Sequence, residues 1–168
     1  MTKEQIRALY EGRIHNWREL GGPDRQVVFF NKEPGRGTWE VFADWLYGAS
    51  DDAPMVNLPE VGSNEEGRNK VASTPGAITQ LSAAWAGGGR VFALAIRSDE
   101  GSEISASDDR ILDGTYPLAR SLFVITNGPV AAETQRIIDF LVGPRGQELV
   151  ARHGYLPIAR AERGEPES

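Results

Sequence analysis

The sequence predicts an α/β fold in which a central, mainly parallel sheet is flanked by helices, and two features indicate it. Apolar runs of strand length alternate along the chain with segments whose apolar residues recur at helical spacing. The runs are continuous rather than alternating, as in residues 27–30 (VVFF), which is typical of parallel strands buried on both faces. With 168 residues, 40% of them hydrophobic, the chain is long enough for one domain or two small lobes.

The first part of the chain predicts two helices around one strand. A capping-box pattern at residues 2–5 (TKEQ) begins a short helix that ends at Gly12. The strand at residues 27–30 runs into a Gly/Pro loop at residues 32–38 (KEPGRGT). A second helix, with one apolar face, follows this loop and ends at Gly48.

The middle of the chain predicts one more helix and two strands. Asn64 and the acidic residues after it are typical of a helix start, and this helix continues to Val71. A short strand begins at residues 77–78, and residues 91–96 form another buried strand. The acidic segment 98–113 is interpreted as a solvated loop.

The last part predicts a strand at residues 122–126 and then two helices. The first helix begins at Pro129, and a Gly-Pro break at residues 143–144 ends it. The second helix covers residues 147–152, and the polar tail at residues 161–168 is expected to be disordered.

Composition excludes several classes of protein. The chain has 18 basic and 24 acidic residues and a net charge of −6, which argues against non-specific nucleic-acid binding. It has no cysteine, so thiolate nucleophiles, iron–sulfur clusters and cysteine-ligated zinc are excluded. The two histidines, His15 and His153, lack a metal-ligand spacing, so we expect no metal and no cofactor. There is neither a membrane-spanning apolar run nor a secretory leader at the start of this sequence.

The loop at residues 32–38 carries the best candidate for chemistry. A helix start leaves backbone N–H groups unpaired and carries a partial positive charge. Gly35 and Gly37 allow a ligand to approach the backbone closely, and Thr38 adds a hydroxyl donor. Lys32 and Arg36 add two full positive charges. These groups together predict a pocket for a tetrahedral oxyanion.

An ordinary strand–helix turn whose basic residues face water is the alternative for this loop. Each helix-terminal charge interaction contributes about 0.3–1 kcal/mol, whereas micromolar binding needs about 8 kcal/mol. A second wall must therefore contribute to any tight site. No Walker A loop, nucleophile elbow or spaced pair of catalytic acids is present, so we do not expect an enzyme.

Five blocks, taken in order, carry a family resemblance; they are residues 9–22 (LYEGRIHNWRELGG), 32–38 (KEPGRGT), 71–78 (VASTPGAI), 113–120 (DGTYPLAR) and 140–157 (FLVGPRGQELVARHGYLP). They resemble the phosphate-binding proteins of ABC phosphate transporters, which have the type II periplasmic-binding-protein fold. Lys32 stands where that family has Arg, and Arg36 stands where it has Ser. Thr79 and Gln80 stand where it has Gly and Tyr.

This resemblance implies a two-lobed solute-binding protein that closes on phosphate, or a similar oxyanion, without catalysis. Residues 1–115 would form the lobe with the anion loop, and residues 116–160 would belong to the other lobe. The ligand contacts carried over to this chain are Lys32, Gly35, Arg36, Gly37 and Thr38. The implied partners are the membrane subunits of an ABC transporter, and the implied location is extracytoplasmic if a leader has been removed, otherwise cytoplasmic.

The family's N-terminal segment has no counterpart in this sequence. We therefore expect exposed sheet edges and apolar helix faces, which a second copy of the chain or another polypeptide would cover. Together with the changes at Arg36 and Thr79, this is the basis of an alternative interpretation, a degenerate sensor or interaction module that no longer binds phosphate tightly.

Overall fold

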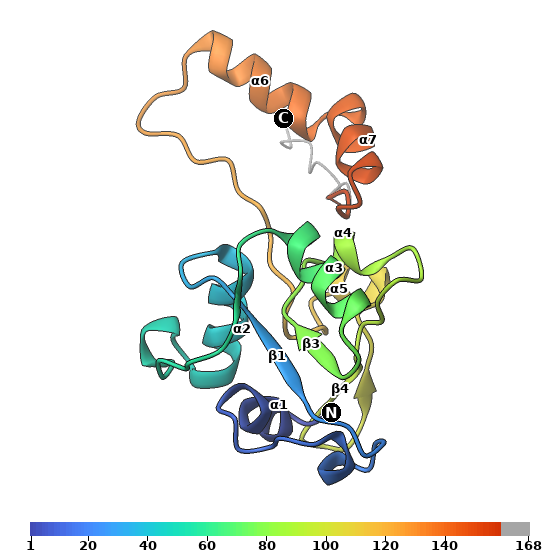
Figure 1. Ribbon diagram of the computed structural model, residues 1–168. Coiled ribbons are helices and arrows are strands. Elements are labelled where there is room, and N and C mark those ends of the chain that lie inside the picture. The colour runs from blue at the N-terminus through green and yellow to red at the C-terminus, as the bar shows by residue number, and fades with distance from the viewer. Residues whose placement is uncertain (159–168) are drawn as a thin grey trace. The chain divides into compact units, whose positions relative to one another are not determined.

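The computed structural model of the protein describes residues 1–158 and divides the chain into two compact units, Met1–Ala119 and a second that begins at Arg120 (Figure 1). The predicted boundary between residues 115 and 116 thus falls inside the first unit. The predicted tail at residues 161–168 lies outside the described residues. None of the helices in the described part of the chain is long and apolar enough to cross a membrane.

The first unit is built on a three-stranded parallel sheet with the strand order β2-β1-β3. Its strands are β1 (Val28–Lys32), β2 (Glu60–Val61) and β3 (Ala77–Thr79). Both β2 and β3 pair with β1 in parallel, with Lys32 opposite Val61 and Phe30 opposite Thr79. The predicted α/β class and the parallel strand at residues 27–30 are confirmed, although β1 extends to Lys32.

One face of the sheet is covered by α1 (Lys3–Tyr10) and α2 (Gly37–Tyr47). Phe29 of β1 contacts Tyr10 of α1 edge to face, with the ring centroids 5.8 Å apart. Tyr10 makes a second edge-to-face contact with Phe42 of α2 at 5.4 Å. These rings and the fully buried Leu46 form the hydrophobic core, which packs α1 and α2 against β1.

The opposite face of the sheet is covered by α3 (Asn64–Ser73). Gly67 of α3 lies so close that a Cβ there would stand 3.5 Å from the side chain of Val61 and 3.7 Å from that of Thr79. Lys70 lies over the ring of Phe30 at 5.4 Å. Because side chains alternate along a strand, Phe29 faces α1 and α2 whereas Phe30 faces α3.

The helix predictions are confirmed with shifted ends. The capping box at Thr2 and the end of α2 at Gly48 are present as predicted. The first helix ends at Tyr10 rather than Gly12, where the backbone takes a φ of +67°. The N-cap of α3 is Ser63 and not Asn64, because the hydroxyl of Ser63 accepts the N–H of Glu66 at 3.0 Å.

The predicted strand at residues 91–96 is wrong except at its end. Only β4 (Ile96–Arg97) forms, and it pairs antiparallel with β5 (Glu103–Ile104). Phe92 and Leu94 are exposed, so this run has a buried face only at Val91 and Ile96. The segment at residues 98–113, predicted as a loop, contains β5 and a short helix, α5 (Asp108–Leu112). Short helices complete the unit: η1 (Trp17–Leu20), η2 (Ser50–Asp52) and α4 (Ala83–Ala86).

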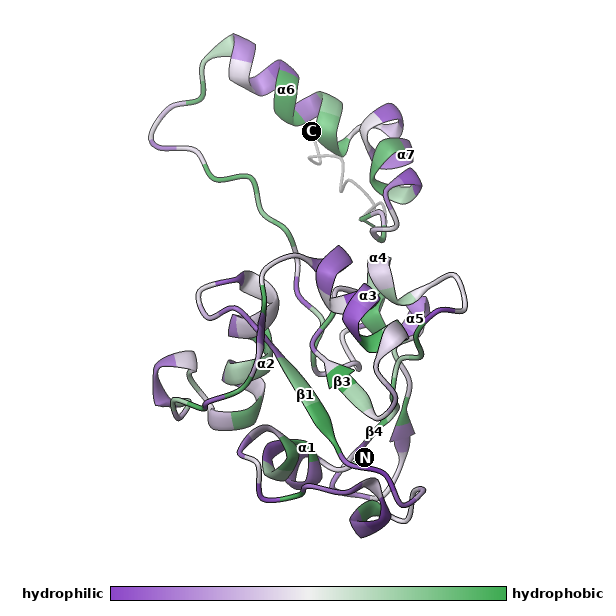
Figure 2. Cartoon of the chain, in the orientation of Figure 1, coloured by the Kyte–Doolittle hydropathy of each residue, from purple (hydrophilic) through white to green (hydrophobic). Residues whose placement is uncertain are grey.

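The second unit consists of α6 (Ala132–Val142) and α7 (Pro144–Arg152). Helix α6 begins at Ala132 instead of Pro129, and α7 begins at Pro144, whose fixed φ suits the first helical position. The predicted strand at residues 122–126 is wrong, because this segment has no ladder partner among the described residues and its apolar side chains are exposed. Figure 2 shows green, hydrophobic stretches both in the chain before α6 and along α6 itself.

Candidate anion-binding site

The candidate site lies at the edge of the sheet where the three parallel strands end. Lys32 ends β1, Val61 ends β2 and Thr79 ends β3, so all three strands deliver the following residues to one edge. Helix α2 begins after β1, and α3 begins after β2. In open parallel sheets, the crevice outside the carboxyl ends of the strands is the usual place for a ligand.

The first turn of α2 has free hydrogen-bond donors. Arg36 is the N-cap, and its side chain does not cap the helix. The first helical bond runs from the N–H of Glu40 to the carbonyl of Arg36 at 3.0 Å. The N–H groups of Gly37, Thr38 and Trp39 precede that bond, and within residues 1–158 they donate to no protein acceptor.

The first turn of α3 differs, because one of its N–H groups is capped by a side chain. The hydroxyl of Ser63 accepts the N–H of Glu66, and the Glu66 carboxylate accepts the N–H of Gly62 at 3.0 Å. These bonds hold the pKa of Glu66 below its usual range, with the hydrogen bond from Gly62 as the main cause and the ammonium of Lys70 as the second. Within residues 1–158, the start of α2 thus has three N–H groups without a protein acceptor, whereas the start of α3 has two, at Asn64 and Glu65.

Lys32 is buried at this edge, with only 4% of its surface exposed. Its ammonium donates to the carbonyl oxygen of Gly62 at 2.7 Å. Burial lowers the pKa of Lys32, and the nearby charge of Arg36 lowers it further. A partly desolvated cation with one of its three hydrogens bonded to protein retains two hydrogens for another acceptor.

Arg36 lies at the same edge and is paired within its own loop. Its Nε donates to Oε2 of Glu33 at 2.9 Å, and both side chains are largely exposed. Gly35 takes a φ of +81°, a conformation that favours glycine, and it turns the loop back so that Glu33 and Arg36 meet.

Gln80 fixes the end of β1 from the other side of the sheet. Its Oε1 accepts the N–H of Lys32 at 2.8 Å, and its Nε2 donates to Oδ1 of Asn31 at 3.1 Å. All three residues are buried. The backbone pairing of β1 with β3 ends at Phe30 and Thr79, and beyond it the side chain of Gln80 accepts the backbone N–H of Lys32 in place of a β3 carbonyl.

Three contributors to this edge were not among the predicted site residues: Glu33, Gly62 and Gln80. The five predicted residues do lie together, because Lys32, Gly35, Arg36, Gly37 and Thr38 are consecutive parts of one strand–loop–helix connection. Gly62 comes from the next strand–helix connection. In a parallel sheet, the connection from β2 to α3 must begin at the same edge as the connection from β1 to α2. A strand predicted just before the helix at residues 64–71 would therefore have pointed to Gly62.

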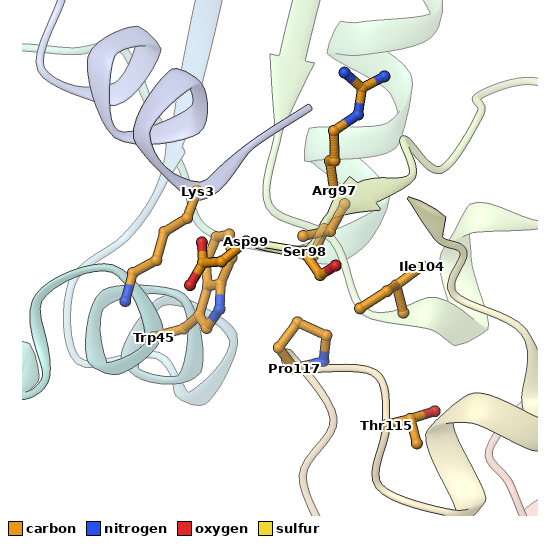
Figure 3. A pocket seen from close by; sticks show the side chains of 9 residues that line it. Lys3, Trp45, Arg97, Ser98, Asp99, Ile104, Thr115 and Pro117 are labelled. Carbon is orange, nitrogen blue, oxygen red and sulfur yellow. The ribbon is translucent and has the colours of Figure 1, made fainter. Parts of the chain in front are cut away.

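A separate cavity of about 250 Å³ lies in the first unit near the other end of α2. Trp45 in its wall is eight residues beyond Gly37, about 12 Å along the helix axis. Figure 3 shows Lys3 and Asp99 beside Trp45, with Ile104 toward the opposite wall. This cavity contains none of the predicted anion-binding residues.

Comparison with known proteins decides the family. A family model described as a PBP superfamily domain matches residues 1–145. The chain belongs to the PBP superfamily. The family resemblance predicted from the five blocks is confirmed at the level of this superfamily. The predicted fold class, a parallel sheet flanked by helices, is confirmed as well.

Similar PBP superfamily members are phosphate-binding proteins. The chain is 27% identical over 159 residues to the phosphate-binding protein PstS of Bacillus subtilis, covering 94% of this chain and 50% of that protein. It is 26% identical to PstS of Borreliella burgdorferi, covering 94% and 58%. The chain thus spans about half the length of these curated relatives.

Solved structures of PBP superfamily members share the fold. A candidate phosphate ABC transporter substrate-binding protein from Clostridium perfringens, solved with bound phosphate, superposes with a TM-score of 0.77 at 25% identity, covering 95% of this chain and 63% of that one. An ABC-type phosphate transport receptor from Vibrio cholerae gives a TM-score of 0.68 at 25% identity, covering 93% and 63%.

Proposed function

We propose that this chain is the anion-binding part of a solute-binding protein, and that its ligand is phosphate or a similar tetrahedral oxyanion. One observation carries the proposal: the free first turn of α2 and the buried ammonium of Lys32 are both at the carboxyl edge of a parallel sheet. Backbone N–H groups at a helix start and an adjacent cation are a recurring way of binding small anions.

Each predicted residue has a role in this proposal. The N–H groups of Gly37 and Thr38 and the hydroxyl of Thr38 donate to the oxyanion, and Gly35 gives the loop its turn. Lys32 donates its two remaining hydrogens, and Arg36 adds a second charge at the rim. No catalysis is part of the proposal, because binding and release of the anion need no bond to break.

The names of the relatives support phosphate as the ligand. Proteins called phosphate-binding protein PstS match nearly the whole of this chain, and a structure with bound phosphate superposes on it. Because these proteins are longer, their ligand is carried over to this chain only as a proposal. The same holds for the membrane subunits of an ABC transporter as partners and for an extracytoplasmic location.

Isothermal titration of the full chain with sodium phosphate and sodium sulfate tests the proposal. We expect saturable binding of at least one anion, and binding about 10-fold to 100-fold weaker in a Lys32→Met variant. Lys70→Met is the matched control, since Lys70 lies on α3 and pairs there with Glu66 at 3.1 Å. Absence of binding below millimolar concentration by a folded wild-type chain would contradict it.

A second copy of the chain is proposed to cover the exposed apolar segment at residues 122–125 (LFVI). These four side chains are between 58% and 89% exposed in the structure. Strand-forming residues without a ladder partner are prone to pair with another chain. Light scattering coupled to size-exclusion chromatography should therefore report a dimer, and a monomer at all concentrations would contradict the pairing.

One observation favours the alternative of a degenerate interaction module. Both cations already have protein partners, Gly62 for Lys32 and Glu33 for Arg36. If these bonds are permanent, they leave the free N–H groups of α2 alone to hold an anion. The titration above separates the two functions, because an interaction module would show no heat with either anion.

A further inference from the structure

The cation at the beginning of α2 has an acidic partner from its own loop. Arg36 Nε donates to Glu33 Oε2 at 2.9 Å. The backbone of Glu33 is held on both sides, because its N–H donates to the carbonyl of Val61 at 3.0 Å and its carbonyl accepts the N–H of Arg36 at 3.2 Å. The turn therefore keeps the carboxylate of Glu33 beside Arg36.

The same carboxylate lies near the second cation of the site. Oε2 of Glu33 is 3.7 Å from the position that a Cβ on Gly62 would take, and Gly62 is the residue whose carbonyl holds the ammonium of Lys32. One negative charge thus lies near both cations, Lys32 and Arg36, in the loop that leads into α2. An incoming anion has to compete with it.

We propose that Glu33 is a specificity-determining residue that restricts this site to divalent tetrahedral oxyanions; this inference rests on the proposed function. A monovalent anion such as nitrate or chloride offers Arg36 no more charge than the carboxylate does, and the carboxylate has the advantage of being tethered. A dianion such as sulfate or hydrogen phosphate interacts twice as strongly with Lys32 and Arg36 together, and it displaces Glu33 from Arg36.

The test uses Glu33→Gln, which keeps the shape of the side chain and removes its charge. The matched control is Glu40→Gln, since Glu40 lies in the first turn of the same helix, is exposed and forms no ion pair within the described residues. Isothermal titration with sulfate is carried out at constant ionic strength, with and without nitrate as a competitor. Circular dichroism confirms the fold of each variant.

An exposed ion pair of this kind is worth little, so Glu33→Gln should bind sulfate about twofold to fivefold more tightly than the wild type. Nitrate should weaken sulfate binding more in Glu33→Gln than in the wild type, whereas Glu40→Gln should behave like the wild type. In an Arg36→Ala background, the gain from Glu33→Gln should disappear.

Four results would overturn the inference. Equal effects of Glu33→Gln and Glu40→Gln would mean that only net charge matters, and a gain that persists without Arg36 would mean that the ion pair is irrelevant. Sulfate binding that nitrate leaves unchanged in Glu33→Gln would refute the selection by charge, while the proposed function would stand. Failure of folded wild-type and Glu33→Gln chains to bind either sulfate or phosphate would refute both.

Discussion

The ammonium of Lys32 lies 2.7 Å from the carbonyl oxygen of Gly62, so the last residue of β1 is bonded to the turn that follows β2. This bond keeps a buried cation at the edge where α2 begins. It also connects two strand–helix units that are 30 residues apart in sequence. The candidate site is therefore a property of the packed sheet and not of the loop alone.

Gln80→Leu should destabilise the first unit. It leaves the N–H of Lys32 and Oδ1 of Asn31 buried without partners, and an unsatisfied buried group costs about 1–3 kcal/mol. Urea denaturation followed by tryptophan fluorescence measures the loss. The double variant Asn31→Leu/Gln80→Leu is the control, and its loss should be smaller than the sum of the two single losses. Strict additivity would contradict the coupling of the two amides.

Anion binding should raise the pKa of Lys32. Burial holds this pKa below 10.5 in the unligated protein, with Arg36 as the second cause, and a bound anion favours the charged ammonium. Affinity should consequently fall as the pH rises through the pKa of Lys32 in the unligated protein. Side-chain NMR of Lys32, with and without sulfate, measures the change. The same pKa in both states would show that the anion binds elsewhere.

Glu66→Gln should remove a part of the stability that depends on pH. The folded-state pKa of Glu66 is lowered from 4.5, so its contribution is present above that value and is lost as the pH falls through the folded pKa. The thermal midpoint of the variant should lie below that of the wild type at pH 7, and the gap should close in acid. Glu65→Gln, the exposed neighbour in the same turn, is the control and should show no such gap.

Ile125→Lys should weaken self-association without affecting the fold of the first unit. Ile125 is 89% exposed in the single chain, so a charge there costs nothing until another chain covers it. Light scattering measures the dimer dissociation constant, and Ser121→Lys serves as a nearby exposed control. Equal association of the two variants would mean that the apolar segment is not the contact.

The sequence was sufficient for the parallel unit around β1 and for the connection from this strand into α2. The pattern there is a continuous apolar run, then a Gly/Pro loop, then a segment with one apolar helix face. This pattern predicts a buried strand that leads into a helix. The helix was expected after residue 38, whereas α2 begins at Gly37 with Arg36 as its N-cap. The succession of strand, loop and helix depends on neighbours in sequence, which is why it could be predicted.

The hydrogen bonds of Lys32, and whether residues 122–126 form a strand, depend on partners that are distant in sequence. No local pattern connects Lys32 to Gly62 or Gln80, because these contacts arise from the strand order β2-β1-β3. The run LFVI has high strand propensity, yet a strand needs a hydrogen-bonded neighbour, and the described residues supply none at that place. In the predicted strand at residues 91–96, likewise, only Ile96 has a ladder partner among the described residues, which is β5.

The most direct test of the central claim is calorimetric titration of the full chain with phosphate, comparing the wild type with Lys32→Met and Lys70→Met. A charged hydrogen bond is worth about 1.5–3 kcal/mol, so Lys32→Met should weaken binding by about 10-fold to 100-fold. Lys70→Met should bind phosphate like the wild type, since the ammonium of Lys70 forms an ion pair with Glu66 on α3. Unchanged affinity in a folded Lys32→Met chain would place the anion elsewhere and would contradict the account.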